Sequence, residues 1–169
     1  MVELGRLDLY IYAALLSSYL CQPRQGHLEA IYFMNGYLKT HDHSNMVFNS
    51  NYINWKEEDF PKHDWTDFYP DAIDEKPINV PEPREMPVQI NMFVDASHAH
   101  NKVTRQSHTG VLIYLNMAPI IWYSKAQRNV KTSTFGAEFV ELKIGTELVK
   151  SLRYNYRWWE YPLNEQQTS

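Results

Sequence analysis

The 169-residue sequence lacks several features that would place a protein outside the cell or in a membrane. Cys21 is its only cysteine, so no disulfide can form within the chain. No apolar run approaches the ~20 residues that a membrane-spanning helix needs. The N-terminal stretch carries Glu3 and Asp8 where a secretory signal would be basic. These absences predict an intracellular protein of the cytoplasm or the nucleus, with no membrane partner.

Common nucleotide-binding and metal-binding motifs are also missing. Neither G-x-x-x-x-G-K-[ST] nor G-x-G-x-x-G occurs, and no segment is repeated. His41 and His43, and likewise His98 and His100, have H-x-H spacing without further Cys or His ligands, so surface or turn histidines are favoured over a zinc site. Cys21 has no catalytic His pattern around it, which favours a buried or half-buried thiol over a nucleophile.

The sequence contains enough apolar residues for a packed core. Its charged residues are strongly segregated along the chain. Apolar residues make up 44% of the chain and aromatic residues 14%, which suits one domain or two small ones. The formal net charge is −4. This small value hides an acidic middle segment followed by a stretch that contains only bases.

The first 42 residues predict a helical hairpin. Apolar residues recur at helical spacing from Leu7 to Leu20 and again from Leu28 to Leu38, and Pro23 and Gly26 interrupt the pattern between them. Two short helices of this kind need another surface to cover them.

Residues 43–87 predict an acidic, proline-rich linker. Between residues 55 and 87 lie ten acids, four bases and six of the nine prolines, and proline blocks both regular helix and central strand. A binding motif is the alternative to a solvated linker. Because five aromatic residues fall in the same stretch, we expect part of it to pack onto a neighbouring surface: Trp55, Phe60, Trp65, Phe68 and Tyr69.

Residues 88–169 predict the beginning of an α/β domain. Apolar residues alternate from Val88 to Val94 in a strand that ends on Asp95, and further strands are expected at about 109–115 and 119–123. A long helix follows from residue 132, with its N-cap at Thr132, Ser133 or Thr134. We expect its core-facing apolar stripe to be formed by Phe135, Phe139, Leu142, Val149, Leu152, Tyr156 and Trp159.

Asp95 and Glu138 are the two acids that a solvated surface explains least well. Asp95 is placed at the carboxyl end of an apolar strand, where α/β proteins often place their sites. Glu138 is expected along the edge of the apolar stripe, whereas Glu147 lies between two helical lysine neighbours and serves as an ordinary surface acid for comparison.

The stretch between Asp95 and Glu138 contains no acid and five bases, Lys102, Arg105, Lys125, Arg128 and Lys131. Paired carboxylates inside a basic surround suit a metal-dependent phosphodiesterase, in which carboxylates hold divalent cations and bases bind the nucleic-acid backbone. The alternative is that the two acids have no catalytic role, because a strand-end Asp and a helix Glu also occur together by chance in α/β proteins.

Four sequence blocks in this region resemble the ribonuclease H domain of copia-type retrotransposons. They are Phe93-Val94-Asp95-Ala96-Ser97, Thr104-Arg105-Gln106-Ser107-His108-Thr109-Gly110, Ala118-Pro119-Ile120-Ile121-Trp122-Tyr123-Ser124-Lys125 and Thr132-Ser133-Thr134-Phe135-Gly136-Ala137-Glu138-Phe139. Their order and spacing agree with that family. Residues 1–42 are similar to the end of the reverse transcriptase region, which precedes ribonuclease H in the same Pol polyprotein.

The resemblance implies a partial ribonuclease H-like fold of class α/β, in which a three-stranded sheet is followed by a long helix and preceded by the helical hairpin. It implies that Asp95 and Glu138 are two of the carboxylates that hold two Mg²⁺ ions, that the substrate is the RNA strand of an RNA–DNA hybrid, and that the rest of the Pol polyprotein is a partner. We also expect hybrid contacts from Ser97, Asn101, Lys102, Thr104, Arg105, Ser107, Lys125, Arg128 and Lys131.

The chain departs from the family where the site would be completed. The family's third catalytic Asp lies in a D-N pair on a strand after the long helix, and this sequence stops at Ser169, where that strand should begin. A second acidic position is Ser97 here, and no Y-x-D-D motif occurs. We therefore expect a fragment with half a catalytic site, inactive by itself. The alternative is a decayed or domesticated module that binds nucleic acid or protein without catalysis.

Overall fold

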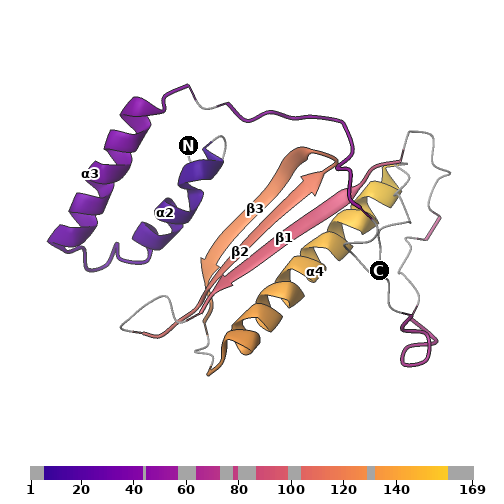
Figure 1. The fold of residues 1–169 in the computed structure, drawn as a ribbon. Coiled ribbons are helices and arrows are strands. Elements are labelled where there is room, and N and C mark those ends of the chain that lie inside the picture. The colour runs from indigo at the N-terminus through magenta and orange to yellow at the C-terminus, as the bar shows by residue number, and fades with distance from the viewer. Residues whose placement is uncertain are drawn as a thin grey trace.

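A computed structural model describes residues 6–43, 45–56, 64–72, 78–79, 87–98, 104–128 and 132–159. The described elements follow one another as α2 (Leu7–Ser17), α3 (Gln25–Thr40), β1 (Ile90–Ser97), β2 (His108–Leu115), β3 (Ala118–Ala126) and α4 (Thr134–Trp158). Figure 1 shows the two N-terminal helices beside the sheet, and the long helix α4 running along it. The predicted mixed α/β class and the order of the elements are confirmed.

The sheet is antiparallel and has the strand order β1-β2-β3. Asp95 is paired with Gly110 and Val111 with Tyr123, and a register shift occurs between Ile113 and Tyr114 of β2. Alternating apolar residues favour these strands because one face of each strand is buried against a helix. The prediction that the first strand ends on Asp95 is wrong, since β1 continues to Ser97.

Helix α4 covers one face of the sheet and packs mainly on β1. The core between them includes Val111 and Ile113 of β2 and Ala137 of α4, all buried. Gly145 comes closest to the sheet, because a Cβ atom at this position would clash with Met92 Sδ and lie 3.0 Å from Val94 Cγ1. A side chain larger than hydrogen would push the helix away from β1.

The prediction for the core-facing stripe of this helix is wrong over its first half. Phe135, Phe139 and Leu142 are exposed, and the buried residues are Ala137, Glu141 and Gly145. Small residues allow the helix backbone to approach the sheet closely, and the bulky residues therefore lie on another side of the helix. Val149, Leu152 and Tyr156 are half-buried, whereas Trp159 is exposed.

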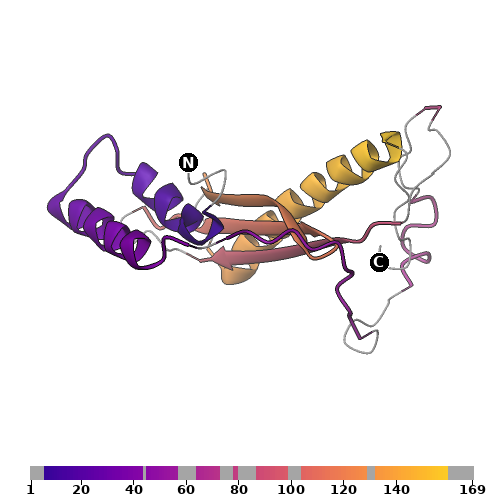
Figure 2. The ribbon, with the colours of Figure 1, turned by 90° about the horizontal axis from the view of Figure 1, so that it is seen from above.

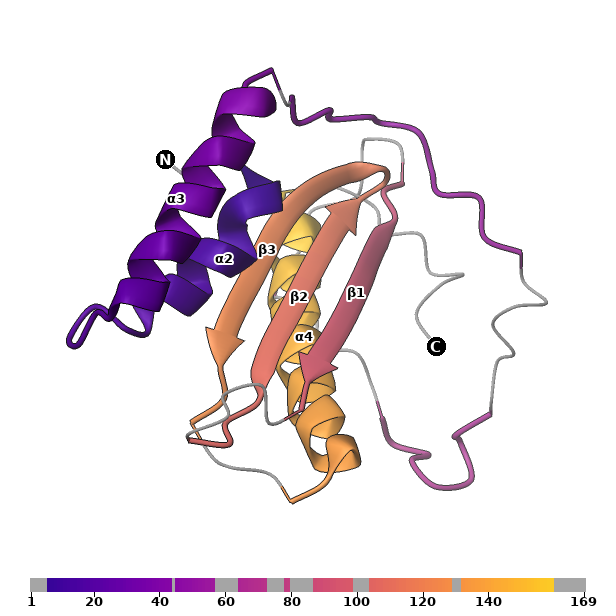
Figure 3. The ribbon, with the colours of Figure 1, turned by 60° about the vertical axis from the view of Figure 1, so that its left-hand side comes forward.

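The hairpin of α2 and α3 lies at the other edge of the sheet, where α2 packs on β3 (Figures 2 and 3). Leu9 is the one residue of α2 that is buried, and α3 has none. Pro23 lies between the two helices as predicted, but Gly26 is inside the first turn of α3 and does not interrupt it. Within the described part of the chain, the sheet covers the hairpin on one side only.

Residues 45–56 lie along the end of the sheet and are tied to it by side chains. The Ile53 amide donates to Gln89 Oε1 at 2.9 Å, the Trp55 indole donates to Asn91 Oδ1 at 2.8 Å, and the Trp55 ring centroid lies 6.0 Å from that of Phe93. Trp55 therefore packs onto the sheet, as expected for part of the acidic segment. Trp65, Phe68 and Tyr69 are exposed, and Phe60 lies outside the described residues.

None of the described helices combines the length and the apolar character that crossing a membrane requires.

Candidate functional site

Asp95 lies near the end of β1 with its side chain exposed. Met92 and Val94 face α4 at Gly145, and successive side chains of a strand point to opposite faces, so Asp95 belongs to the face of the sheet that turns away from α4. Across the ladder from it is Gly110, which has no side chain to cover the carboxylate.

Glu138 lies in the first turns of α4 and is exposed. The helix begins here because the Ser133 hydroxyl accepts a hydrogen bond from the Gly136 amide at 3.1 Å, so Ser133 is the N-cap among the three predicted residues. Glu147, chosen as the surface acid, is exposed as predicted, with its carboxylate 3.8 Å from Lys143 Nζ.

Glu141 is a buried acid that the sequence reasoning missed. Its side chain is only 1% exposed, and its Oε1 atom accepts hydrogen bonds from the Asp95 amide at 2.7 Å and the Gly110 amide at 2.8 Å. Burial raises the pKa of the Glu141 carboxyl above its ordinary value, and the negative charges of Asp95 and Glu138 raise it further, while the two amide donors lower it. Glu141 therefore joins α4 to both β1 and β2 at the point where Asp95 and Gly110 are paired.

The spacing of residues 137, 141 and 145 was the signal that could have revealed this role. Ala137, Glu141 and Gly145 recur every four residues, and two of them are small. A helix side formed by small residues is the side that packs most closely. An acid on that side has to be buried and hydrogen-bonded.

The negative charges of Asp95 and Glu138 both raise the pKa of the Glu141 carboxyl, and the Asp95 backbone amide bonds to it directly. Among the described residues, however, no three acids, histidines or cysteines are arranged to hold a metal ion together. Mg²⁺ prefers oxygen ligands and is often held by one or two carboxylates, with water and phosphate completing the octahedron. Two exposed carboxylates fit this chemistry in kind, and the remaining ligands would come from water and substrate.

The face of the sheet that carries Asp95 has further polar residues. Ser97 is two residues along β1, His108 is paired with Ser97, and Ser124 lies on β3 across from Gly110. His108 is 6% exposed and its Nε2 atom is 2.7 Å from Ser124 Oγ, so this pair is bonded within the protein. Of the three residues only Ser97 is exposed, and His108 and Ser124 were not predicted.

The residues predicted to contact nucleic acid differ in their exposure. Ser97, Thr104, Arg105, Lys125 and Arg128 are exposed. Arg105 has a φ of 58° in the loop before β2. Ser107 is fully buried, so the prediction that it contacts a hybrid is wrong. Asn101, Lys102 and Lys131 lie outside the described residues.

Gln127 holds the loop after β3 against the beginning of α4. Its Nε2 atom donates to Thr109 Oγ1 and to the Ala137 carbonyl, both at 3.0 Å, and its backbone amide donates to the Ser107 carbonyl at 2.8 Å. These bonds tie β2, β3 and α4 together at the Asp95 end of the sheet. Ser107 takes part in this junction through its carbonyl and is buried.

The weaker sequence signals have structural explanations. His41 follows α3, where its ring stacks on Tyr37 at 4.2 Å, and His43 is exposed, in agreement with surface histidines. His98 is half-buried, and His100 lies outside the described residues. Cys21 is exposed, so the prediction of a buried or half-buried thiol is wrong. The turn after α2 exposes it because no described element covers the connection to α3.

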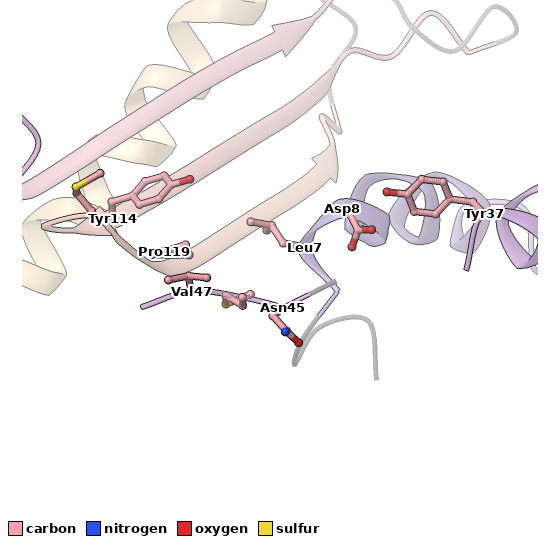
Figure 4. Close-up of a pocket in the computed structure, with 9 residues that line it drawn as sticks. Leu7, Asp8, Tyr37, Asn45, Val47, Tyr114 and Pro119 are labelled. Atoms are coloured by element: carbon pink, nitrogen blue, oxygen red, sulfur yellow. The ribbon is translucent and has the colours of Figure 1, made fainter. Parts of the chain in front are cut away.

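A cleft of about 530 Å³ lies at the other end of the sheet, between α2, α3, residues 45–47 and the β2–β3 turn (Figure 4). Tyr114 and Pro119 line its sheet side, and Asp8 and Tyr37 lie at its helix side. Hydrogen bonds from the Arg6 guanidinium lower the pKa of the Asp8 carboxyl to about 2. Because Asp95 is paired with Gly110, near the start of β2, the cleft is separate from the candidate site.

Comparison of the chain with family models, curated proteins and solved structures finds no match.

Proposed function

We propose that the chain is a fragment of a copia-type retrotransposon Pol polyprotein, consisting of the end of the reverse transcriptase region and the first half of a ribonuclease H domain. Its chemistry would be Mg²⁺-dependent hydrolysis of the RNA strand of an RNA–DNA hybrid. We further propose that the chain binds such a hybrid but does not cleave it without additional carboxylates.

One observation carries the proposal. Asp95 on β1 and Glu138 on α4 come from distant parts of the sequence. The Asp95 amide donates to Glu141 Oε1 at 2.7 Å, and Glu138 lies three residues before Glu141 on α4, so the fold brings both acids to the same β1–α4 contact. Their approach depends on an antiparallel sheet followed by a long helix, which is the order of elements that the motif resemblance implies.

The division of roles follows from position. Asp95 and Glu138 would hold Mg²⁺, which when bound activates a water and stabilises the leaving oxygen. The Glu141 carboxylate accepts a hydrogen bond from the Asp95 backbone amide and thereby holds this end of β1 against α4. Arg105, Lys125 and Arg128 are exposed cations that would bind phosphates, and Ser97 and Thr104 are exposed donors that would reach 2′-hydroxyls.

Hybrid binding tests the proposal directly. Fluorescence anisotropy of a labelled RNA–DNA hybrid should show binding that weakens with salt, because each phosphate contact releases counterions and adds about 0.7 to 0.9 to the salt slope. Mg²⁺ should strengthen binding to the wild-type chain but not to Asp95→Asn or Glu138→Gln. Glu147→Gln is the matched control, since this exposed acid lies on the same helix and should leave the Mg²⁺ effect unchanged.

A cleavage assay under the same conditions should detect no product. Robust Mg²⁺-dependent cleavage that disappears in Asp95→Asn would contradict the proposed inactivity, although it would support the proposed family. If the hybrid did not bind, or if its binding did not depend on salt, nucleic acid would be excluded as a ligand of this chain.

A non-enzymatic binding module is the second candidate. It is favoured by the finding that the described residues offer two carboxylates and no three-acid group at the site. Such a module would bind the hybrid with equal affinity in Mg²⁺ and in EDTA, and Asp95→Asn would have no effect. The Mg²⁺ dependence of binding therefore separates the two candidates.

A further inference from the structure

Helix α4 has a second apolar side that no described part of its own chain covers. Phe135 is 74% exposed, Phe139 is 60% exposed and Leu142 is also exposed, and the two phenyl rings stack with centroids 6.3 Å apart. At about 100° per residue this side lies roughly 130° around the helix axis from Ala137, Glu141 and Gly145, which face the sheet. Another helix can therefore approach it without displacing the sheet.

The spacing on this side is that of a coiled-coil seam. Phe135, Phe139, Leu142, Thr146 and Val149 follow one another at intervals of four, three, four and three residues, which fill d and a positions alternately. Thr146 is the polar member, and its hydroxyl donates to the Leu142 carbonyl at 2.8 Å. The seam therefore presents no polar group that would lose a partner on burial.

Charges beside the seam identify both the partner and the orientation. Glu138 occupies a g position and Lys143 the following e position, five residues later, and both are exposed. In a parallel pair of helices, the g residue of one faces the e residue of the next heptad on the other, so Glu138 of each copy would face Lys143 of its partner. An antiparallel pair would place e beside e and g beside g instead.

We propose that α4 is an interface between two copies of this chain, which pair in parallel through Phe135, Phe139 and Leu142. The interface is isologous, so both copies form the same contacts and the Glu138–Lys143 pair occurs twice. This inference does not rest on the proposed nuclease ancestry. Because the seam extends over about two heptads, we expect a weak dimer with a Kd on the order of 10⁻⁵ M.

Sedimentation velocity of the full chain, from about 5 to 500 µM, tests the pairing. The wild-type chain should change from monomer to dimer over this range, and Phe139→Glu should remain monomeric. Phe33→Glu is the matched control, because Phe33 is 73% exposed on α3 and lies outside the seam. Both substituted side chains are exposed, so circular dichroism should show helix content equal to that of the wild type.

A charge reversal tests the orientation. Lys143→Glu should weaken the dimer several-fold because it places two acids opposite each other, and Glu138→Lys combined with Lys143→Glu should restore it. Lys143 also lies 3.8 Å from Glu147 of its own helix. The double variant does not restore that contact, so recovery reports on the pair between copies alone.

Three results would overturn the proposal. If the wild-type chain stayed monomeric at every concentration tested, the proposed interface would not exist. Equal loss of the dimer in Phe33→Glu and Phe139→Glu assigns association to a surface other than the seam. Failure of the double reversal to restore the dimer excludes parallel pairing.

Discussion

Glu141 shows at the scale of one residue how a buried charge limits stability. Its carboxyl pKa is raised from the ordinary value of 4.5, which means that the folded protein holds this proton more tightly than the unfolded chain. The contribution of Glu141 to stability is therefore complete below pH 4.5, decreases as the pH rises through the raised pKa, and is lost above it. The electrostatic penalty at neutral pH comes from burial and from the charges of Asp95 and Glu138.

Two substitutions separate the charge of Glu141 from its hydrogen bonds. The amide oxygen of Glu141→Gln can still accept from Asp95 and Gly110, so this variant should equal or exceed the wild-type unfolding free energy at pH 7 and match it near pH 4. Glu141→Ala leaves two amides without an acceptor and should lose about 2–4 kcal/mol. Urea unfolding between pH 4 and 8 measures both effects. If Glu141→Gln were less stable than the wild type at every pH, the carboxylate itself would be required.

The residues that sequence reasoning identified were those with local signals. Asp95 and Glu138 stand out because their neighbours along the chain are apolar. The Asp95 amide bonds to Glu141 of α4, and Glu138 lies one turn before Glu141 on that helix. Glu141 was missed because its burial depends on the close approach of α4 to β1. Ser107 was predicted to contact a hybrid because its hydroxyl is a polar donor, but it is buried, and its carbonyl accepts from the Gln127 amide of the loop after β3.

At the scale of an element, α4 illustrates why a helical period alone does not identify the buried side. The sequence contains both a bulky apolar row from Phe135 and a row of small residues from Ala137. Hydrophobicity favours the first row, and close packing against the sheet selects the second. The position of the helix was predictable, and its rotation about its own axis was not.

Gly145 and Gly36 provide a matched test of this packing. A Cβ atom at Gly145 would clash with Met92 and approach Val94, so Gly145→Ala should lose about 1–3 kcal/mol despite the better helix propensity of alanine. At Gly36 on α3, a Cβ atom would have open space around it to 4 Å, so Gly36→Ala should gain about 0.5–1 kcal/mol. Thermal or urea unfolding measures the two differences. Equal effects at both positions would contradict the close contact of α4 with β1.

At the scale of the whole molecule, the described residues form a small apolar core. Leu9, Val111, Ile113 and Ala137 are buried, whereas large apolar side chains such as Phe135 and Phe139 of α4 are exposed. A core this small leaves α4 with an apolar side that can bind another helix.

The candidate site lies at the outer strand of the described sheet. Asp95 turns away from α4 while Glu138 lies on it, and β1 is the outer strand of the described sheet, so no further described strand separates the two carboxylates. A cation at the edge of β1 would draw them together, because two nearby carboxylates repel each other by a few kcal/mol unless a positive charge intervenes. The proposed function requires such a shared cation.

Binding of Mn²⁺, followed by electron paramagnetic resonance of the free ion, measures whether the two carboxylates share a cation. We predict saturable binding by the wild-type chain that weakens at least tenfold in Asp95→Asn and equally in Glu138→Gln, while Glu147→Gln binds as the wild type does. Identical binding curves for all four proteins would contradict it, because the two carboxylates would then hold no common cation.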